Sequence, residues 1–192
     1  MRGLATDYNH RCRRDAGATE SAMKLTDFFL EQLEREAVPT RKALERVPEG
    51  RDDWKPHPKS MPLGYLASLV ARMPSWIGLT IKLDEFDMRP QGGSPYTQQS
   101  QTTNRGLIQL LDESLAEARQ ALAGTTDEHL MKPWRLLAGG KLMSEQPRYV
   151  VISDAVFNHL AHHRGQLTVY LRLNDASVPA IYGPSADEGR AA

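Results

Sequence analysis

The chain has 192 residues, with 24 basic and 24 acidic side chains, and 40% of its residues are apolar. This length suits one domain whose core needs no disulfide or structural metal, and a single cysteine, Cys12, excludes an intramolecular disulfide and a multi-cysteine zinc site. The balanced charge provides no long-range field that would attract nucleic acid or an anionic membrane, so neither is expected as a partner. Because no run approaches the roughly 18 to 20 apolar residues of a membrane span, and no signal-peptide pattern is visible, we expect a cytoplasmic globular protein.

The first 22 residues differ from the rest of the chain. They contain four arginines, two glycines and only isolated apolar residues. Because they show no strand or helix period, nothing in this segment is suited to dock on a core. We therefore predict a disordered tail over residues 1–22 and a short disordered end over residues 189–192. Met23 is a candidate for the true start of translation, which N-terminal sequencing of the native protein would decide.

The first predicted helix covers residues 25–47. Its apolar side chains recur at steps of three and four, the period of a helix that buries one face. Thr26 or Asp27 can cap its start. Pro39 predicts a kink, because proline lacks an amide hydrogen and clashes with the preceding turn. The segment 48–50, Pro-Glu-Gly, ends the helix.

The second predicted helix covers residues 62–83 and follows an irregular segment that contains two prolines. Its apolar stripe consists of Leu63, Leu66, Leu69, Val70, Met73, Ile77 and Ile81. Pro74 interrupts the pattern, so we expect a bend there. Residues 87–102 are rich in Pro, Gly, Ser and Gln, a composition that predicts a long loop.

A third helix is predicted over residues 104–122, where leucines share one side and Gly124 stops the helix. Two short apolar runs around Gly139-Gly140 indicate a small β-hairpin or an ordered loop. The fourth helix covers residues 147–173, and an extended apolar segment over residues 178–184 can pack back on the helices. Together these elements predict an all-α fold, a four-helix bundle over residues 23–188 with a short hairpin or ordered loop before the last helix.

Three of the six histidines fall within a single stretch of five residues, 159–163, in the last predicted helix. His159 and His163 are four residues apart, so they project from one helix face, close enough to share an ion. That face also carries Ile152, Val156, Leu167 and Tyr170, so both rings are expected to point into the bundle. Neutral imidazoles are good ligands for zinc, nickel or iron(II), although a catalytic zinc site usually has three protein ligands.

A structural role for the same pair is the alternative. A buried histidine pair can be satisfied by hydrogen bonds alone, for instance to Gln166, Tyr170 or a buried water. His162 and Arg164 fall on neighbouring faces, where surface or interface positions are expected. Gly165 most simply allows a close approach between helices.

The last-helix motif HLAHHRGQ, residues 159–166, followed by Tyr170-Leu-Arg, resembles the signature of the DinB/YfiT-like superfamily. Two further segments support the resemblance. Residues 54–67 are similar to the family's entry into its second helix, and residues 178–188, which include YGPSADE, are similar to the closing segment of one branch. The resemblance therefore covers about residues 23–188.

The resemblance implies a four-helix bundle that holds a divalent metal through three histidines. Two of them correspond to His159 and His163. The third belongs to the second helix, at the position that Leu69 occupies here. Leucine cannot coordinate a metal, so the site is expected to be partly degenerate. His57 is a possible substitute on the preceding loop, whereas Asp84 and Glu85 lie about four turns from Leu69, and His129 is expected at the surface.

Two functions from different classes follow. The first, which the resemblance implies, is a divalent-metal-dependent transferase or hydrolase in which the ion activates a low-molecular-weight thiol or a water molecule. The second is a non-catalytic bundle with structural histidines that binds a small molecule or a protein partner. The resemblance also implies a homodimer.

Overall fold

The computed structural model describes residues 23–93 and 100–189. The predicted N-terminal tail, residues 190–192 of the C-terminal end predicted over 189–192, and residues 94–99 of the predicted loop lie outside the described residues. The elements in chain order are α1 (Leu25–Leu44), α2 (Leu63–Arg72), the 3-10 turn η1 (Met73–Ser75), α3 (Trp76–Lys82), β1 (Glu85–Asp87), α4 (Asn104–Ala123), α5 (Asp127–Leu130), β2 (Pro133–Ala138), β3 (Lys141–Pro147), α6 (Arg148–Val151), the π-helix η2 (Ile152–Asn158) and α7 (His159–Leu173).

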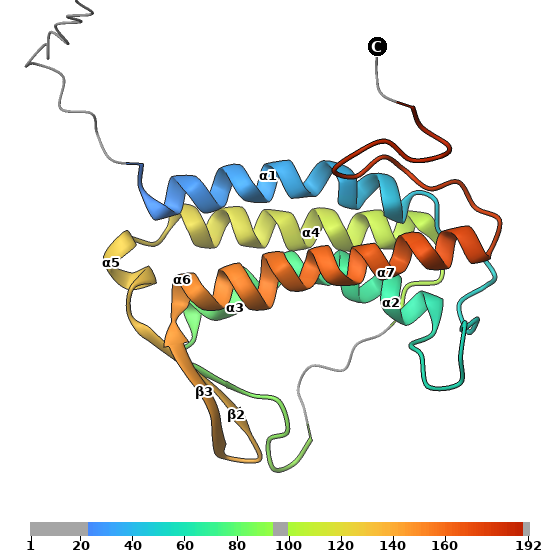
Figure 1. Cartoon of the computed structure of the whole chain (residues 1–192). Helices are drawn as coiled ribbons and strands as arrows, with labels where there is room; N and C mark the ends of the chain where they lie inside the picture. The colour runs from blue at the N-terminus through green and yellow to red at the C-terminus, as the bar shows by residue number, and fades with distance from the viewer. Residues whose placement is uncertain (1–22, 94–99, 190–192) are drawn as a thin grey trace, which may run out of the picture.

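The long helices pack alongside one another, and a small sheet projects from one end of them (Figure 1). Helix α4 contacts α1, α2 and α3, and α7 contacts both α1 and α2. The fold is therefore mostly helical, with helices in the four predicted regions. The prediction of an all-α fold is wrong in one respect, because the chain also forms a three-stranded sheet. No helix in the described ranges is long and apolar enough to cross a membrane.

The second predicted helix is divided where Pro74 stands. Helix α2 ends at Arg72, the single turn η1 contains Pro74, and α3 begins at Trp76. Proline has no amide hydrogen to continue the helical hydrogen-bond pattern, so the interruption has the cause that the sequence indicated. By contrast, α1 continues through Pro39 to Leu44.

Helix α1 is capped by a residue far away in the chain. The two carboxylate oxygens of Asp127 accept hydrogen bonds from the amides of Leu25 and Thr26, at 2.9 and 3.1 Å. The residue before the helix is Lys24, and it makes no side-chain capping bond. The prediction that Thr26 or Asp27 caps this helix is therefore wrong, because tertiary contact with α5 supplies the acceptor that a local side chain would otherwise provide.

The sheet has the order β1-β2-β3, with β1 parallel to β2 and β2 antiparallel to β3. The hairpin β2–β3 confirms the element predicted around Gly139-Gly140, both of which have positive φ angles, 61° and 75°. Strand β1 was not predicted, and its last residue, Asp87, begins the predicted loop. The Asp87 carboxylate accepts hydrogen bonds from the Gly139 and Gly140 amides at 2.9 and 2.7 Å, which fastens β1 to the hairpin turn.

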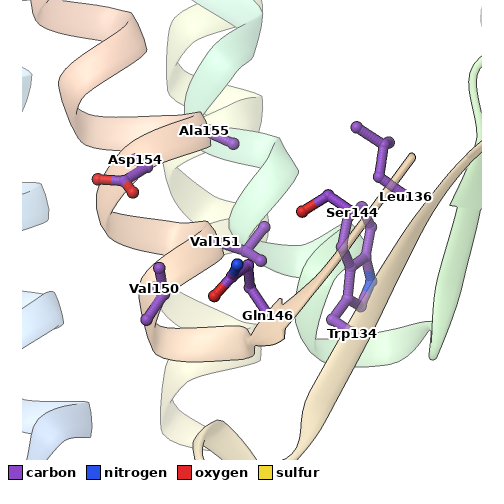
Figure 2. Close-up of a pocket in the computed structure, with 8 residues that line it drawn as sticks. All are labelled: Trp134, Leu136, Ser144, Gln146, Val150, Val151, Asp154 and Ala155. Carbon is purple, nitrogen blue, oxygen red and sulfur yellow. The ribbon is translucent and has the colours of Figure 1, made fainter. Parts of the chain in front are cut away.

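Arg148 joins the sheet to the helices. Its guanidinium is 1% exposed and donates to the carbonyls of Thr80, Leu83, Lys132 and Pro133, and it also pairs with the Asp84 carboxylate. These partners come from the end of α3 and the start of β2. The contacts hold the base of the hairpin beside α6, so that Trp134 and Leu136 lie opposite Val151 and Ala155 (Figure 2).

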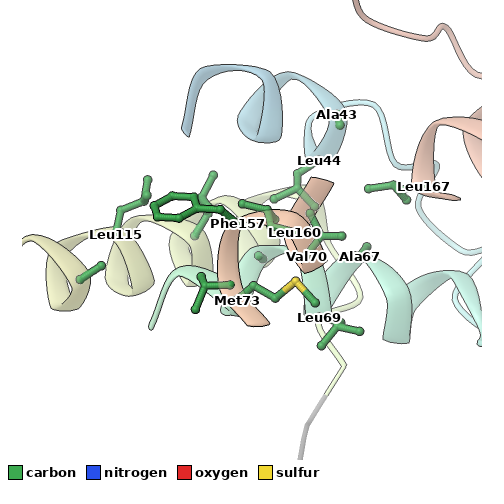
Figure 3. Close-up of a cluster of buried hydrophobic side chains, with 14 of the residues drawn as sticks. Ala43, Leu44, Ala67, Leu69, Val70, Met73, Leu115, Phe157, Leu160 and Leu167 are labelled. Carbon is green, nitrogen blue, oxygen red and sulfur yellow. The ribbon is translucent and has the colours of Figure 1, made fainter. Parts of the chain in front are cut away.

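The core lies between α1, α2, α4 and the last helical segment (Figure 3). Leu44, Val70, Leu111 and Leu167 are fully buried there. Leu69, at 8% exposure, belongs to the same apolar cluster. Each such leucine stabilises the fold by about 1.5 to 3 kcal/mol through burial of its side chain.

Candidate functional site

His159 and His163 face each other one turn apart on α7. Their Nε2 atoms are 2.8 Å apart and their ring centroids 4.5 Å apart. His163 is buried at 8% exposure, whereas His159 is half-buried, with the Trp76 ring centroid 5.7 Å from its own. The structure therefore brings the two predicted rings together on the face that the apolar stripe indicated.

The outer nitrogens of both rings are held by hydrogen bonds. The Nδ1 atom of His163 lies 2.8 Å from the Oε1 atom of Gln166, and the amide nitrogen of Gln166 lies 3.1 Å from the Nε2 atom of His162. The His159 ring bonds to the backbone carbonyl of Ala155. Both Nε2 atoms are thus turned inward toward one another.

The π-helix η2 immediately precedes this pair. The amide of His159 donates to the carbonyls of Asp154 and Val156, while the carbonyl of Ala155 accepts from the His159 ring. Single turns of π-helix are frequent at functional sites. The sequence gives no periodic signal for such a turn, so the fourth helix was predicted as regular.

Burial lowers the pKa of both His159 and His163. For His159, the hydrogen bond to Ala155 opposes this effect, and for His163 the bond to Gln166 does so. Neighbouring histidines lower the pKa of each ring further, since two positive charges would lie close together. Both rings therefore favour the neutral form, which is the form that binds a metal ion.

The position of the third family ligand is apolar. Leu69 lies on α2, a helix that packs against α7, and its side chain belongs to the core. Within residues 23–93 and 100–189, no group of three or more His, Cys, Asp or Glu side chains could hold a metal ion. The described residues therefore offer a metal ion two ligands here, the imidazoles of His159 and His163.

The other candidate ligands have separate roles. His57 is exposed, and its Nδ1 atom accepts a hydrogen bond from the Lys59 amide within its own loop. His129 was predicted at the surface, but it is half-buried and bonds to the Ile81 carbonyl through Nε2, at 2.9 Å. Asp84 pairs with Arg148, and Glu85 pairs with Arg135 at 2.7 Å. Cys12 lies outside the described residues.

Two predictions about the last-helix motif are wrong. Arg164 was expected at the surface or an interface, but its side chain is 1% exposed and pairs with Glu36 at 2.6 Å. It also donates to the Thr40 hydroxyl at 2.8 Å and to the Tyr182 hydroxyl. Gly165 was expected at a close helix contact, but a Cβ atom there would meet nothing within 4 Å. The charged residue of the motif is structural, and its glycine is not required for packing.

Tyr170 does not bond to the histidine pair. Its hydroxyl donates to the Met61 carbonyl at 3.2 Å, and its ring meets Trp54 edge-on, with the centroids 5.5 Å apart. Of the two side chains that the sequence offered as partners for the pair, only Gln166 has that role. The extended C-terminal segment packs back on the helices, as predicted. The Tyr182 hydroxyl donates a hydrogen bond to Glu36, and Glu188 forms an ion pair with Arg46.

Comparison with known proteins gives consistent results. Residues 26–190 match the sequence model of the DinB family. A DinB-like protein from Bacillus cereus ATCC 10987 is 21% identical, with a TM-score of 0.60 over 80% of this chain and 95% of that one. The DinB-like protein YjoA from Bacillus subtilis is 17% identical, with a TM-score of 0.61 over 85% of this chain and 99% of that one. No curated protein matches the chain. At these identities the two structures show a shared fold.

Proposed function

The chain belongs to the DinB family, and from this premise we propose that His159 and His163 are the protein ligands of a divalent metal ion used for thiol transfer or hydrolysis. The observation that carries the proposal is the inward orientation of the two Nε2 atoms at 2.8 Å. Imidazole nitrogens suit zinc, nickel and iron(II). When bound, such an ion supplies Lewis-acid chemistry that makes a thiolate or a hydroxide available at neutral pH.

The hydrogen bonds around the pair favour this assignment. The amide nitrogen of Gln166 faces His162, so its oxygen faces His163 and accepts a proton from Nδ1. The Ala155 carbonyl accepts the Nδ1 proton of His159 in the same way. With both Nδ1 protons donated in this way, each neutral ring has its lone pair on Nε2, where a metal ion can bind. A cation bound to both Nε2 atoms would use these lone pairs, and histidine ligands of metals usually donate their other N–H to such acceptors.

Gln166 and the Ala155 carbonyl therefore act as positioning groups that fix which nitrogen of each ring is available. Because only two protein ligands are present in the described part of the site, the remaining coordination positions are open to water or to a low-molecular-weight thiol. Leu69, at the position of the family's third ligand, belongs to the apolar core and supplies no ligand atom. This arrangement favours a nucleophile that is bound together with the ion over one supplied by a side chain.

The experiment is metal titration of protein that was purified without a histidine tag and stripped with chelator. We expect zinc, nickel or iron(II) to bind at one equivalent, and His163→Ala and His159→Ala to abolish binding. His57→Ala is the matched control, because His57 is exposed in a separate loop. Addition of cysteine to the cobalt(II)-loaded protein should produce a sulfur-to-cobalt charge-transfer band. Less than about a tenth of an equivalent after reconstitution would reject the proposal, since a working site should fill.

A non-catalytic bundle is the second candidate, and the apolar residue Leu69 in the family's third ligand position favours it. Under this alternative, one ring donates a proton from its Nε2 atom directly to the other ring. His163→Ala would then reduce the free energy of unfolding without changing the affinity for any ligand. Binding of one equivalent of zinc by the parent protein would contradict the non-catalytic alternative.

The family membership also makes a homodimer and a small-molecule ligand part of the proposal. Light scattering coupled to size-exclusion chromatography gives the mass in solution. A monomer at all accessible concentrations would remove the dimer from the proposal and leave the metal site unaffected.

A further inference from the structure

A cavity of about 420 Å³ lies between the β2–β3 hairpin and the start of the last helical segment, and it is open to solvent. The residues that line it come from β2, β3, α6 and η2: Trp134, Leu136, Ser144, Gln146, Val150, Val151, Asp154 and Ala155. Figure 2 shows these side chains between the strands and the helix. Cavities that bind small molecules are typically about 300 to 1,000 Å³ and mostly apolar with a few polar groups, which describes this one.

The strand alternation and the hairpin register build one wall of the cavity. Trp134 pairs with Gln146 and Leu136 pairs with Ser144 across the two strands. Side chains two residues apart in a strand share a face, so an apolar column on β2 lies beside a polar column on β3. The helix wall opposite contributes Val151 and Ala155 (Figure 2). A ligand there would meet apolar surface on two sides and hydrogen-bonding groups along the hairpin edge.

Asp154 is the one charged residue among the eight that line the cavity. Its Oδ1 atom accepts a hydrogen bond from the side-chain Nδ2 atom of Asn158 at 2.9 Å, and no ion pair within the described residues uses this carboxylate. Two basic residues on the neighbouring elements already have acidic partners, Arg148 with Asp84 and Arg135 with Glu85. The negative charge at the edge of the cavity is therefore not neutralised, and it favours a positively charged ligand.

We propose that this cavity binds a small organic amine with an apolar body. The apolar part lies between Trp134 and Leu136 on one side and Val151 and Ala155 on the other. The ammonium group faces the Asp154 carboxylate, and Ser144 and Gln146 serve as hydrogen-bond partners for further polar groups. The proposal goes beyond the metal-dependent function, because the eight lining residues include no histidine and the cavity needs no ion to bind an amine.

The cavity nevertheless lies next to the histidine pair. Ala155 lines it, and the carbonyl of the same residue holds the His159 ring one turn further along. Ala155 precedes the proposed ligand His159 by four residues in the last helical segment.

The test uses phenethylamine and 3-phenylpropionate, which have the same ring and a similar chain length but opposite charge. Binding is followed by two-dimensional NMR of the full chain in the presence of EDTA, so the result does not depend on the metal site. We expect phenethylamine to shift the Trp134 indole signal and the amides of residues 144–155. We expect 3-phenylpropionate to bind at least about fivefold more weakly, because it cannot form the ion pair with Asp154 and an exposed ion pair contributes up to about 1 kcal/mol.

Asp154→Asn should weaken phenethylamine binding about fivefold. Glu145→Gln is the matched control, since Glu145 is exposed on the same hairpin but does not line the cavity, and it should bind phenethylamine like the parent. Ala155→Phe, which fills the cavity, should abolish binding, whereas Ala123→Phe at the exposed end of α4 should not.

Equal affinity for the two probes, unchanged binding by Asp154→Asn, or shifts confined to another region would overturn the proposal. Absence of phenethylamine binding together with normal zinc binding would refute the amine site alone. The reverse outcome would refute only the metal-dependent function.

Discussion

Arg164 of α7 pairs with Glu36 of α1 over 2.6 Å, with the arginine side chain 1% and the glutamate side chain 15% exposed. The Tyr182 hydroxyl donates to the same carboxylate at 2.8 Å, and the Arg164 Cζ atom lies over the Tyr182 ring, 5.1 Å from the ring centroid. The first helix, the last helix and the C-terminal segment therefore meet at one buried charge. Because a buried cation without its partners is unfavourable, this network favours one arrangement of the three segments.

Replacement of Arg164 should therefore destabilise the fold. We expect Arg164→Ala to lower the free energy of unfolding by about 3 kcal/mol, because it leaves the Glu36 carboxylate partly buried without its cation. Arg172→Ala is the control, since Arg172 and its partner Asp187 are 49% and 29% exposed and such pairs contribute less than about 1 kcal/mol. Urea unfolding measures both values, and similar losses in the two variants would contradict a structural role specific to Arg164.

Gly165→Ala should stabilise the protein. The residue lies inside α7, and a Cβ atom would have no neighbour within 4 Å. Alanine in a helix interior is favoured over glycine by about 1 kcal/mol. Thermal unfolding would show a higher Tm for the variant. A lower Tm would mean that the glycine has a packing role that these contacts do not account for.

The Asp127 cap predicts a dependence of stability on acid pH. Hydrogen bonds from the Leu25 and Thr26 amides lower the pKa of the Asp127 carboxyl, the bond from Leu25 most strongly. A lowered pKa in the folded state means that the cap stabilises the protein above the unfolded pKa of about 3.9. This contribution is lost as the pH falls through the lower folded value.

The comparison of Asp127→Asn with the parent protein tests this dependence. The difference between their free energies of unfolding should be largest near neutral pH and shrink as the pH falls below about 4. Asp53→Asn, in an exposed loop position, is the control for the removal of one acidic group. A difference that stays constant with pH would show that the carboxylate does not cap α1.

Leu69→His tests the degenerate third position. If α2 presents this residue to the histidine pair as in the family pattern, the new imidazole should raise zinc affinity by at least about tenfold, since even indirect partners of a metal change affinity by about 10- to 100-fold. Val38→His, which adds an exposed histidine on α1, is the control for nonspecific binding. Equal zinc affinity in the two variants would show that position 69 does not face the site.

Local patterns in the sequence determined the main helices, the hairpin and the facing histidines. The step of four residues places His159 and His163 on one face of a helix, Pro74 divides the second predicted helix, and Gly139-Gly140 allow the positive φ angles of a tight turn. Each of these features depends on residues within a few positions of one another, so the printed order of residues contains the necessary information.

The tertiary structure alone decided which charged groups are buried and what holds the elements together. Strand β1 exists because Glu85–Asp87 pair with β2, about fifty residues further on, and three residues are too few to show an alternating pattern. Arg148, Arg164 and Asp127 acquire their roles from partners between 15 and 128 residues away. The long side chains of Arg148 and Arg164 would be exposed unless distant segments surrounded them, so only the packing of the whole chain could place them in the interior.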